Sequence, residues 1–116
     1  MKNKELEVLI ESIKPNLNLI QDNFENYQNN HFVQKSSQFF CLELNGEAGE
    51  LANLEKKEWK GKNVEFAKFE DEAADVFIAL FNYCNSKNIN LADALIKKLQ
   101  RIELIRIENK AKGEEY

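Results

Sequence analysis

The stretch EAGELANLEKKEWKGKNVEFAKFEDEAAD, which runs from Glu47 to Asp75, decides the fold that we expect for this chain. It opens with two acids three residues apart, Glu47 and Glu50, and closes with two more, Glu72 and Asp75. Residue 61 lies midway between Glu47 and Asp75 and also midway between Glu50 and Glu72. It is Gly61, within the turn-forming sequence KGKN. A helical hairpin that reverses direction there brings all four carboxylates to the same height.

Four converging carboxylates repel one another unless a positive charge lies between them. A hard divalent cation that binds through oxygen, such as Mg²⁺, is the natural occupant, and Mn²⁺ is a substitute of similar chemistry. One acid pair at this spacing means little in a chain with 20 acids among 116 residues. The pairs about Gly61 differ because small residues separate the acids and are expected to let two helices approach closely: Ala48, Gly49, Ala73 and Ala74.

Apolar residues recur every three or four positions along the rest of the chain, which is the helical period, and strand-like alternation is nearly absent. We therefore expect an all-α fold, a four- to five-helix bundle with a central helical hairpin. The fifth helix would arise if Pro15 divided the first helix in two. The expected helices are residues 4–29, 37–59, 64–86 and 90–110, with a polar link at 29–36 and Asn90 as an N-cap.

The expected third helix is apolar on nearly all sides, with Phe77, Ile78 and Phe81 beside its main stripe. A helix of that kind is buried nearly all round. A chain of this length offers too few neighbouring helices to cover such a surface. We therefore expect self-association, as a homodimer or a homotetramer.

Length and composition fit one domain, residues 1–116, of an ordinary globular protein with 43% hydrophobic residues. The sequence has no run of about 18 apolar residues that would predict a membrane span, and its N-terminus lacks the apolar core of a secretory signal. The net charge of −4 argues against binding to duplex nucleic acid. Cys41 and Cys84 lie in apolar helical stretches, so we expect two reduced core thiols in a cytoplasmic protein. The lone His31 offers them no metal-binding partner set.

The sequence GEAGEL at residues 46–51, followed by DEAADV at residues 71–76, resembles the MazG-like branch of the all-α nucleoside triphosphate pyrophosphohydrolases. The mark of that family is Glu-x-x-Glu, a spacer, then Glu-x-x-Asp on paired helices. INLADA at residues 89–94, with Lys98 after it, is similar to the family's next helix. The resemblance covers about Phe40 to Arg106, within a motif-bearing core of about residues 37–110.

This resemblance implies cleavage of a nucleoside or deoxynucleoside triphosphate to the monophosphate and pyrophosphate, in a house-cleaning role that removes unwanted nucleotides. It also implies that Glu47, Glu50, Glu72 and Asp75 hold Mg²⁺, with one of the acids, Glu47 or Glu50, activating the attacking water. One position departs from the pattern. Ile102 stands where the family often has asparagine, which removes a group able to orient phosphate or sugar.

Three further residues are candidates for substrate contact. Lys57, seven residues after Glu50, and Lys98 on the last helix can each reach a phosphate or be an ordinary surface lysine. Trp59 near the turn can stack on a base or serve packing. An alternative to the enzyme also stays open: a non-catalytic helical interaction module whose acidic site is a relict.

Overall fold

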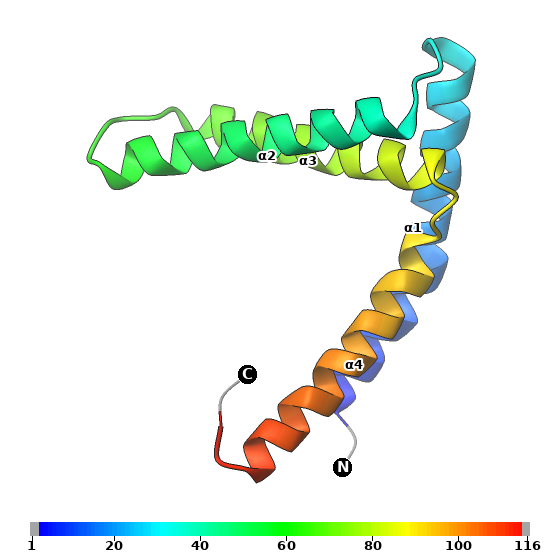
Figure 1. Cartoon of the computed structure of the whole chain (residues 1–116), viewed down its shortest axis with the longest axis vertical. Helices are drawn as coiled ribbons and strands as arrows, with labels where there is room; N and C mark the ends of the chain where they lie inside the picture. The colour runs from blue at the N-terminus through cyan, green and yellow to red at the C-terminus, as the bar shows by residue number, and fades with distance from the viewer. Residues whose placement is uncertain (1–2, 115–116) are drawn as a thin grey trace. The chain divides into compact units, whose positions relative to one another are not determined.

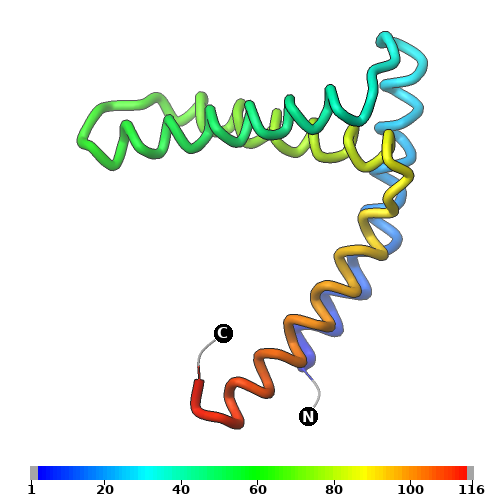
Figure 2. The backbone as a smooth tube through the Cα atoms, in the orientation of Figure 1, coloured from blue at the N-terminus to red at the C-terminus, as the bar shows by residue number. Residues whose placement is uncertain are grey.

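The computed structural model describes residues 3–114, which form four α-helices and no β-strand. The helices are α1 (Lys4–His31), α2 (Ser37–Trp59), α3 (Phe66–Ser86) and α4 (Leu91–Ala111), as Figure 1 shows in ribbon form and Figure 2 as a backbone tube. The all-α prediction is confirmed, with four helices rather than five. The predicted helix ends agree with the observed ones within the ordinary uncertainty of about two residues.

The first helix continues through Pro15, so the five-helix alternative is wrong. Proline lacks an amide hydrogen and disturbs the helical hydrogen bonds around it. Next to it, the Ser12 hydroxyl donates to the carbonyl oxygen of Leu9 at 2.7 Å, and the side-chain amide of Asn16 donates to the carbonyl oxygen of Ser12 at 2.8 Å. These side-chain hydrogen bonds reach the carbonyls of Leu9 and Ser12 and not that of Glu11, whose usual donor the proline lacks, so the helix continues with that hydrogen bond missing.

The chain divides into two compact units, one made of residues up to 22 together with residues from 90 onward, the other of residues 23–89. In the second unit, α2 and α3 lie side by side and run in opposite directions (Figures 1 and 2). Their backbones lie close together over a longer stretch than those of any other helix pair in residues 3–114. This pair is the predicted central hairpin, and it carries the candidate site. The organisation as one domain stays a prediction.

The hairpin reverses at the predicted glycine. Gly61 has a φ of +88°, in the left-handed region that glycine adopts without a steric penalty. Its amide donates to the carbonyl oxygen of Glu58 at 2.9 Å, and the amide of Lys62 donates to the carbonyl oxygen of Lys57 at 3.0 Å. This is the Schellman arrangement, which satisfies the last carbonyls of a helix while the chain turns away. The end of α2 therefore determines where α3 can begin.

A small aromatic core holds the unit of residues 23–89 together. Phe81 of α3 is fully buried, and its ring stacks on Phe24 of α1 at 5.3 Å between centroids and meets Phe77 edge-on at 4.7 Å. Burying one such side chain stabilises the fold by about 1.5–3 kcal/mol. The prediction that Phe81 lies on an outward, interface-forming side of its helix is wrong, because the end of α1 covers it within one chain.

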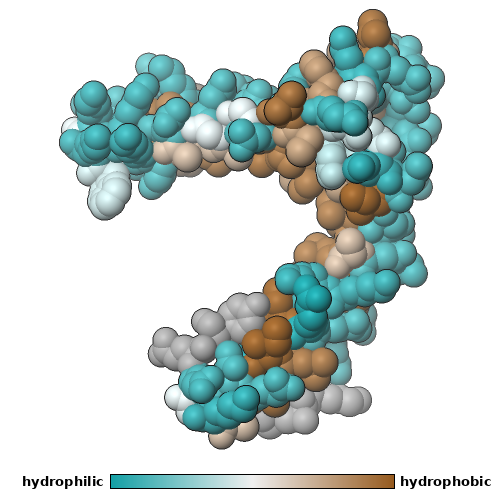
Figure 3. Space-filling view, in the orientation of Figure 1, coloured by the Kyte–Doolittle hydropathy of each residue, from teal (hydrophilic) through white to brown (hydrophobic). Residues whose placement is uncertain are grey.

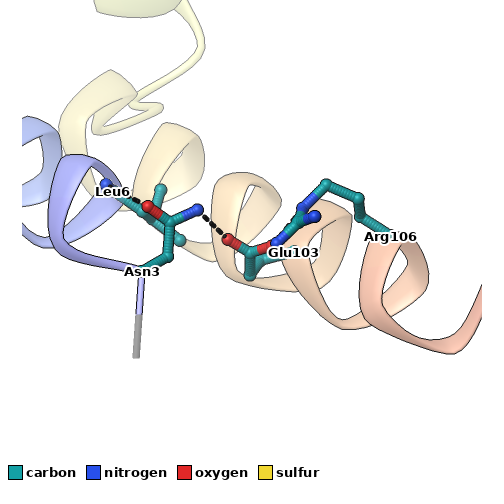
Figure 4. A network of polar contacts seen from close by, with 4 residues as sticks. All are labelled: Asn3, Leu6, Glu103 and Arg106. Carbon is teal, nitrogen blue, oxygen red and sulfur yellow. Dashed lines mark hydrogen bonds and ion pairs between the residues drawn. The ribbon is translucent and has the colours of Figure 1, made fainter. Parts of the chain in front are cut away.

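In the other unit, polar side chains link α1 to α4. The side-chain oxygen of Asn3 accepts from the amide of Leu6 at 3.0 Å and so caps α1, while its side-chain amide donates to Glu103 of α4 (Figure 4). Glu103 also accepts from the guanidinium of Arg106 (Figure 4). The hydrogen bond from Arg106 and then that from Asn3 hold the pKa of Glu103 below its usual value. The start of α1 is thereby tied to the last turns of α4.

Predictions about individual residues have mixed outcomes. The N-cap at Asn90 is confirmed, since its side-chain oxygen accepts from the amide of Asp93 at 2.9 Å. Cys84 is buried as predicted, and burial raises the pKa of its thiol. Cys41 is exposed, so its predicted place in the core is wrong. The apolar residues around Cys41 in the sequence share α2 with it but point in other directions.

Large apolar side chains are exposed on the surface of both units (Figure 3). On α3, Phe77 is 47% exposed and Ile78 is 42% exposed, as predicted for that helix. Within residues 3–114 the buried apolar side chains are few: Ile13, Phe40, Ala79, Phe81, Cys84 and Ala92. No helix in this part of the chain is long and apolar enough to cross a membrane.

Candidate functional site

The paired helices bring the predicted acids together. Glu47 and Glu50 of α2 form one group with Glu72 of α3, in which one carboxylate oxygen of each residue lies within 4.8 Å of the others. A second group, defined by the same spacing, contains Glu72 again together with Asp71 and Asp75. Because Glu72 belongs to both groups, the five residues form one continuous set of carboxylates, which we call the acidic cluster. Asp75 joins only the second group, so the single site of four carboxylates predicted from the symmetry about the turn stays a prediction.

The carboxyl groups of the acidic cluster change one another's pKa. The pKa of Glu72 is raised to about 7, first by a hydrogen bond with Glu47 and then by desolvation and by Glu50. The hydrogen bond with Glu72 lowers the pKa of Glu47, but desolvation and the charges of Asp75 and Glu50 outweigh it and raise that pKa overall. Both glutamates are half-buried. The metal-free cluster therefore keeps a proton on Glu72 for part of the time at neutral pH.

Two oxygens of the cluster have no group to balance their charge. Glu47 Oε2 and Glu72 Oε2 are each buried without a hydrogen-bond donor. Within residues 3–114, no lysine, arginine or histidine forms an ion pair with a carboxylate of the cluster. An unpaired buried charge is costly, and carboxylate oxygens are the ligands that Mg²⁺ prefers. These residues therefore fit a hard divalent cation held between α2 and α3.

A pocket of about 320 Å³ adjoins the acidic cluster. Glu47 and Asp75 contribute to its wall, and Lys35, from the link between α1 and α2, also lines it. The ammonium of Lys35 lies 5.2 Å from the centroid of the Phe39 ring. The aromatic residues that line the pocket are Phe32, Phe39 and Phe40. Carboxylates, one cation and apolar rings thus share one concave surface.

The three residues predicted for substrate contact do not line this pocket. Lys57 belongs to a lysine-rich surface near the hairpin turn, with Lys56 and Lys60 among its neighbours. Trp59 is 87% exposed near the same turn, so a packing role within one chain is wrong. Lys98 is an exposed residue of α4, in the other unit. Their parts in substrate binding stay predictions.

Other residues beside the cluster were missed by the sequence analysis. Lys68 lines a separate surface pocket with Asp71 and Glu72, and its position four residues before Glu72 is a usable signal on a helix. Asp71 precedes Asp75 by the same spacing and so shares its face. Asn82 lies seven residues after Asp75 and lines the 320 Å³ pocket beside the acidic cluster. It interrupts the apolar run VFIALFNYC, and a lone amide in such a run is a signal for a polar partner.

The prediction that the small residues between the acids let the two helices pack closely is wrong. A Cβ added at Gly49 would meet nothing within 4 Å, and Ala48, Ala73 and Ala74 are exposed. Acids three residues apart share one helix face, so the residues between them point to other sides of the helix. When the acids face the partner helix, the small residues face away from it.

Comparisons with known proteins supply no family for this chain. No protein-family model matches it, and searches of curated proteins and of solved structures found no match either. Its function therefore has to be argued from the acidic cluster and the pocket beside it.

Proposed function

We propose that this protein is an Mg²⁺-dependent hydrolase that splits a nucleoside or deoxynucleoside triphosphate into the monophosphate and pyrophosphate. The acidic cluster carries the proposal. Carboxylates from two antiparallel helices meet, and two of their buried oxygens lack a donor. Among residues 3–114 no cation pairs with them. The choice of scissile bond and the house-cleaning role rest on the resemblance of GEAGEL and DEAADV to the MazG-like family.

Mg²⁺ held by Glu47, Glu50, Glu72 and Asp75 would neutralise the triphosphate and stabilise the charge that develops in the transition state, and Mn²⁺ would substitute for it. The two helices present these carboxylates from rigid backbone, which keeps their spacing when substrate binds. Glu47 or Glu50 accepts the proton of the attacking water. Glu47 suits this role because it is half-buried and because desolvation and the neighbouring carboxylates raise its pKa.

Positive side chains near the cluster can bind the phosphates. Lys68 lines one surface pocket with Asp71 and Glu72, and Lys35 lines the 320 Å³ pocket together with Glu47. A lysine ammonium is a compact charge on a flexible stem, so it can follow a phosphate group through the reaction. We assign these two lysines, ahead of Lys57 and Lys98, as the first candidates for phosphate contact.

Hydrolysis assays with the natural triphosphates and Mg²⁺ test the proposal. In ¹⁸O-labelled water the label should enter the monophosphate, and pyrophosphate should be the other product. Glu50→Gln should lower kcat/KM by about 100-fold or more, whereas Glu58→Gln, a change at an exposed glutamate of the same helix, should not alter it. Labelled orthophosphate with a diphosphate as co-product, or full activity of Glu50→Gln, would contradict the assignment.

We also propose that the functional unit is a homodimer or homotetramer. The support is the apolar surface left on each chain, which includes Phe77 and Ile78 of α3 and Leu42 of α2. Contiguous apolar surface of several hundred Å² is rare on soluble monomers. The same surface favours the alternative function, a non-catalytic helical interaction module. Such a module would keep its partner after Glu50→Gln and would release no pyrophosphate from any triphosphate.

A further inference from the structure

The pocket beside the acidic cluster extends well beyond the acids. Asp75 and Asn82 both line it and lie seven residues apart on α3. That spacing is two helical turns, about 10.5 Å along the helix axis. It is comparable to the distance in a nucleotide between the phosphate next to the sugar and the far edge of the base. The pocket thus contains the carboxylate of Asp75 and the amide of Asn82 two helical turns apart along α3.

Asn82 is a buried polar residue of this pocket whose side-chain oxygen also lacks a partner. Its side chain is only 7% exposed, and its Oδ1 atom is buried without a hydrogen-bond donor. A half-turn of the carboxamide exchanges its oxygen and nitrogen, so the group can present an acceptor or a donor at that place. A buried polar group left unpaired lowers the stability of the fold. The ligand of the pocket is the natural source of the missing hydrogen bond.

The surroundings of Asn82 select the chemistry of that ligand. A second pocket, of about 310 Å³, shares Asn82 and Lys35 with the first. Glu25 and Lys35 are its charged residues, and it is lined mainly by amides and hydroxyls, among them Gln28, Asn29 and Ser36. Such groups recognise neutral polar ligands, whereas phosphate recognition relies on cations. In the first pocket, Phe39 and Phe40 offer rings on which a flat heterocycle can stack.

We propose that the pocket receives the nucleobase of the substrate and that the carboxamide of Asn82 pairs with the polar edge of that base. The inference rests on the proposed function, which places the phosphates at the acidic cluster. The hydrogen-bonding edge of a nucleobase presents donors beside acceptors, and a carboxamide matches such an edge with two hydrogen bonds. Stacking on Phe39 or Phe40 adds affinity for every base. Asn82 is therefore the residue that determines which base is preferred.

The test measures equilibrium binding, in the presence of Mg²⁺, of non-hydrolysable α,β-imido triphosphates that carry each of the four natural bases. Inorganic tripolyphosphate serves as the base-free probe. The unmodified protein should favour its best base over its worst by about 10- to 100-fold. Asn82→Leu, which keeps the branched shape and removes the amide, should lose most of this preference and bind tripolyphosphate as before. Asn45→Ala, at an exposed asparagine of α2, should change neither.

Circular dichroism and thermal unfolding check that the variants fold, and Asn82→Leu should unfold at no lower temperature than the unmodified protein because it removes an unpaired buried amide. If Asn82→Leu does not fold, Asn82→Ala is measured instead with the same analogues and tripolyphosphate. A base preference that survives in the folded variant overturns the inference, and so does equal binding of all four analogues by the unmodified protein.

The same experiment separates this inference from the proposed function. Asn82-dependent base preference without hydrolysis of the natural triphosphates would support the base site and refute the hydrolase. Hydrolysis without any effect of Asn82 on base preference would support the hydrolase and refute the base site. A protein that binds no analogue and hydrolyses no natural triphosphate would refute both.

Discussion

Changing Glu72 to Gln should remove the pH dependence that this carboxyl gives to the stability of the protein and to its Mg²⁺ binding. In the metal-free protein the pKa of Glu72 is raised from 4.5 to about 7, so the folded chain binds this proton more tightly than the unfolded chain does. The stability that this group contributes is therefore fully present below pH 4.5 and is lost as the pH rises through about 7. Above that pH Glu72 adds its negative charge to the metal-free cluster. Glu72→Gln removes that charge, so it should unfold at a higher temperature there than the unmodified protein.

Mg²⁺ should act in the opposite direction, because it binds ionised carboxylates. Below the pKa of about 7, each ion has to displace the proton on Glu72. The affinity for Mg²⁺ should then fall about tenfold for each pH unit, or roughly a hundredfold over two units. Glu72→Gln should bind Mg²⁺ more weakly than the unmodified protein at alkaline pH. Its affinity should also lose most of the pH dependence, since the titrating group is gone.

Isothermal titration with Mg²⁺ at about pH 5.5 and about pH 8, together with thermal unfolding under the same conditions, measures both effects. The matched control is Glu70→Gln, at an exposed glutamate of the same helix, which should behave like the unmodified protein. Equal Mg²⁺ affinity at the two pH values would refute the role given to Glu72. Undiminished Mg²⁺ binding by Glu72→Gln would refute the metal site that includes it.

Three further predictions concern packing and assembly. Phe81→Ala should lower the free energy of unfolding in urea by about 3–5 kcal/mol, and a loss below about 1 kcal/mol would contradict its place in the core. Gly61→Ala should lower the free energy of unfolding by about 1–2 kcal/mol because the backbone there is left-handed. Gly49→Ala should raise it by about 0.5–1 kcal/mol because an added Cβ meets nothing within 4 Å. Equal effects of the two changes in urea unfolding would contradict this contrast. Ile78→Arg should lower the mass found by light scattering, and a mass of 13.5 kDa for the unmodified protein would exclude a homo-oligomer.

The hairpin and its acids could be predicted because both depend on local spacing. Helix geometry fixes that Glu47 and Glu50 share a face, and a glycine midway between the pairs sets where the chain can reverse. The same reasoning placed Lys57 on the face of Glu50 but did not consider its height along the helix. Seven residues from Glu50 is two turns, about 10.5 Å along the axis, which carries the lysine toward the hairpin turn.

What could not be predicted depends on which segment covers a given face. Periodicity marks Phe81 as apolar, but it cannot say whether the end of α1 or a second copy of the chain covers it. The structure answers this with the ring of Phe24. Asn82 is a comparable case, because its pocket is built by the end of α1 and the link after it, and these are distant from it in sequence. Tertiary packing decides both positions, and no pattern within α3 contains that information.

Selection for stability alone would remove Glu47 and Glu72 from this chain. Each has a buried oxygen without a donor, and replacing such a group by a neutral or apolar one commonly makes a protein more stable. Folding therefore tolerates or favours most substitutions at these two positions, and only a bound ligand opposes them. In a lineage that no longer needed the ligand, these glutamates should be lost early, while Gly61 and Phe81 should persist. The persistence of the two acids among descendants would thus report on use of the site, independently of how well the hairpin is retained.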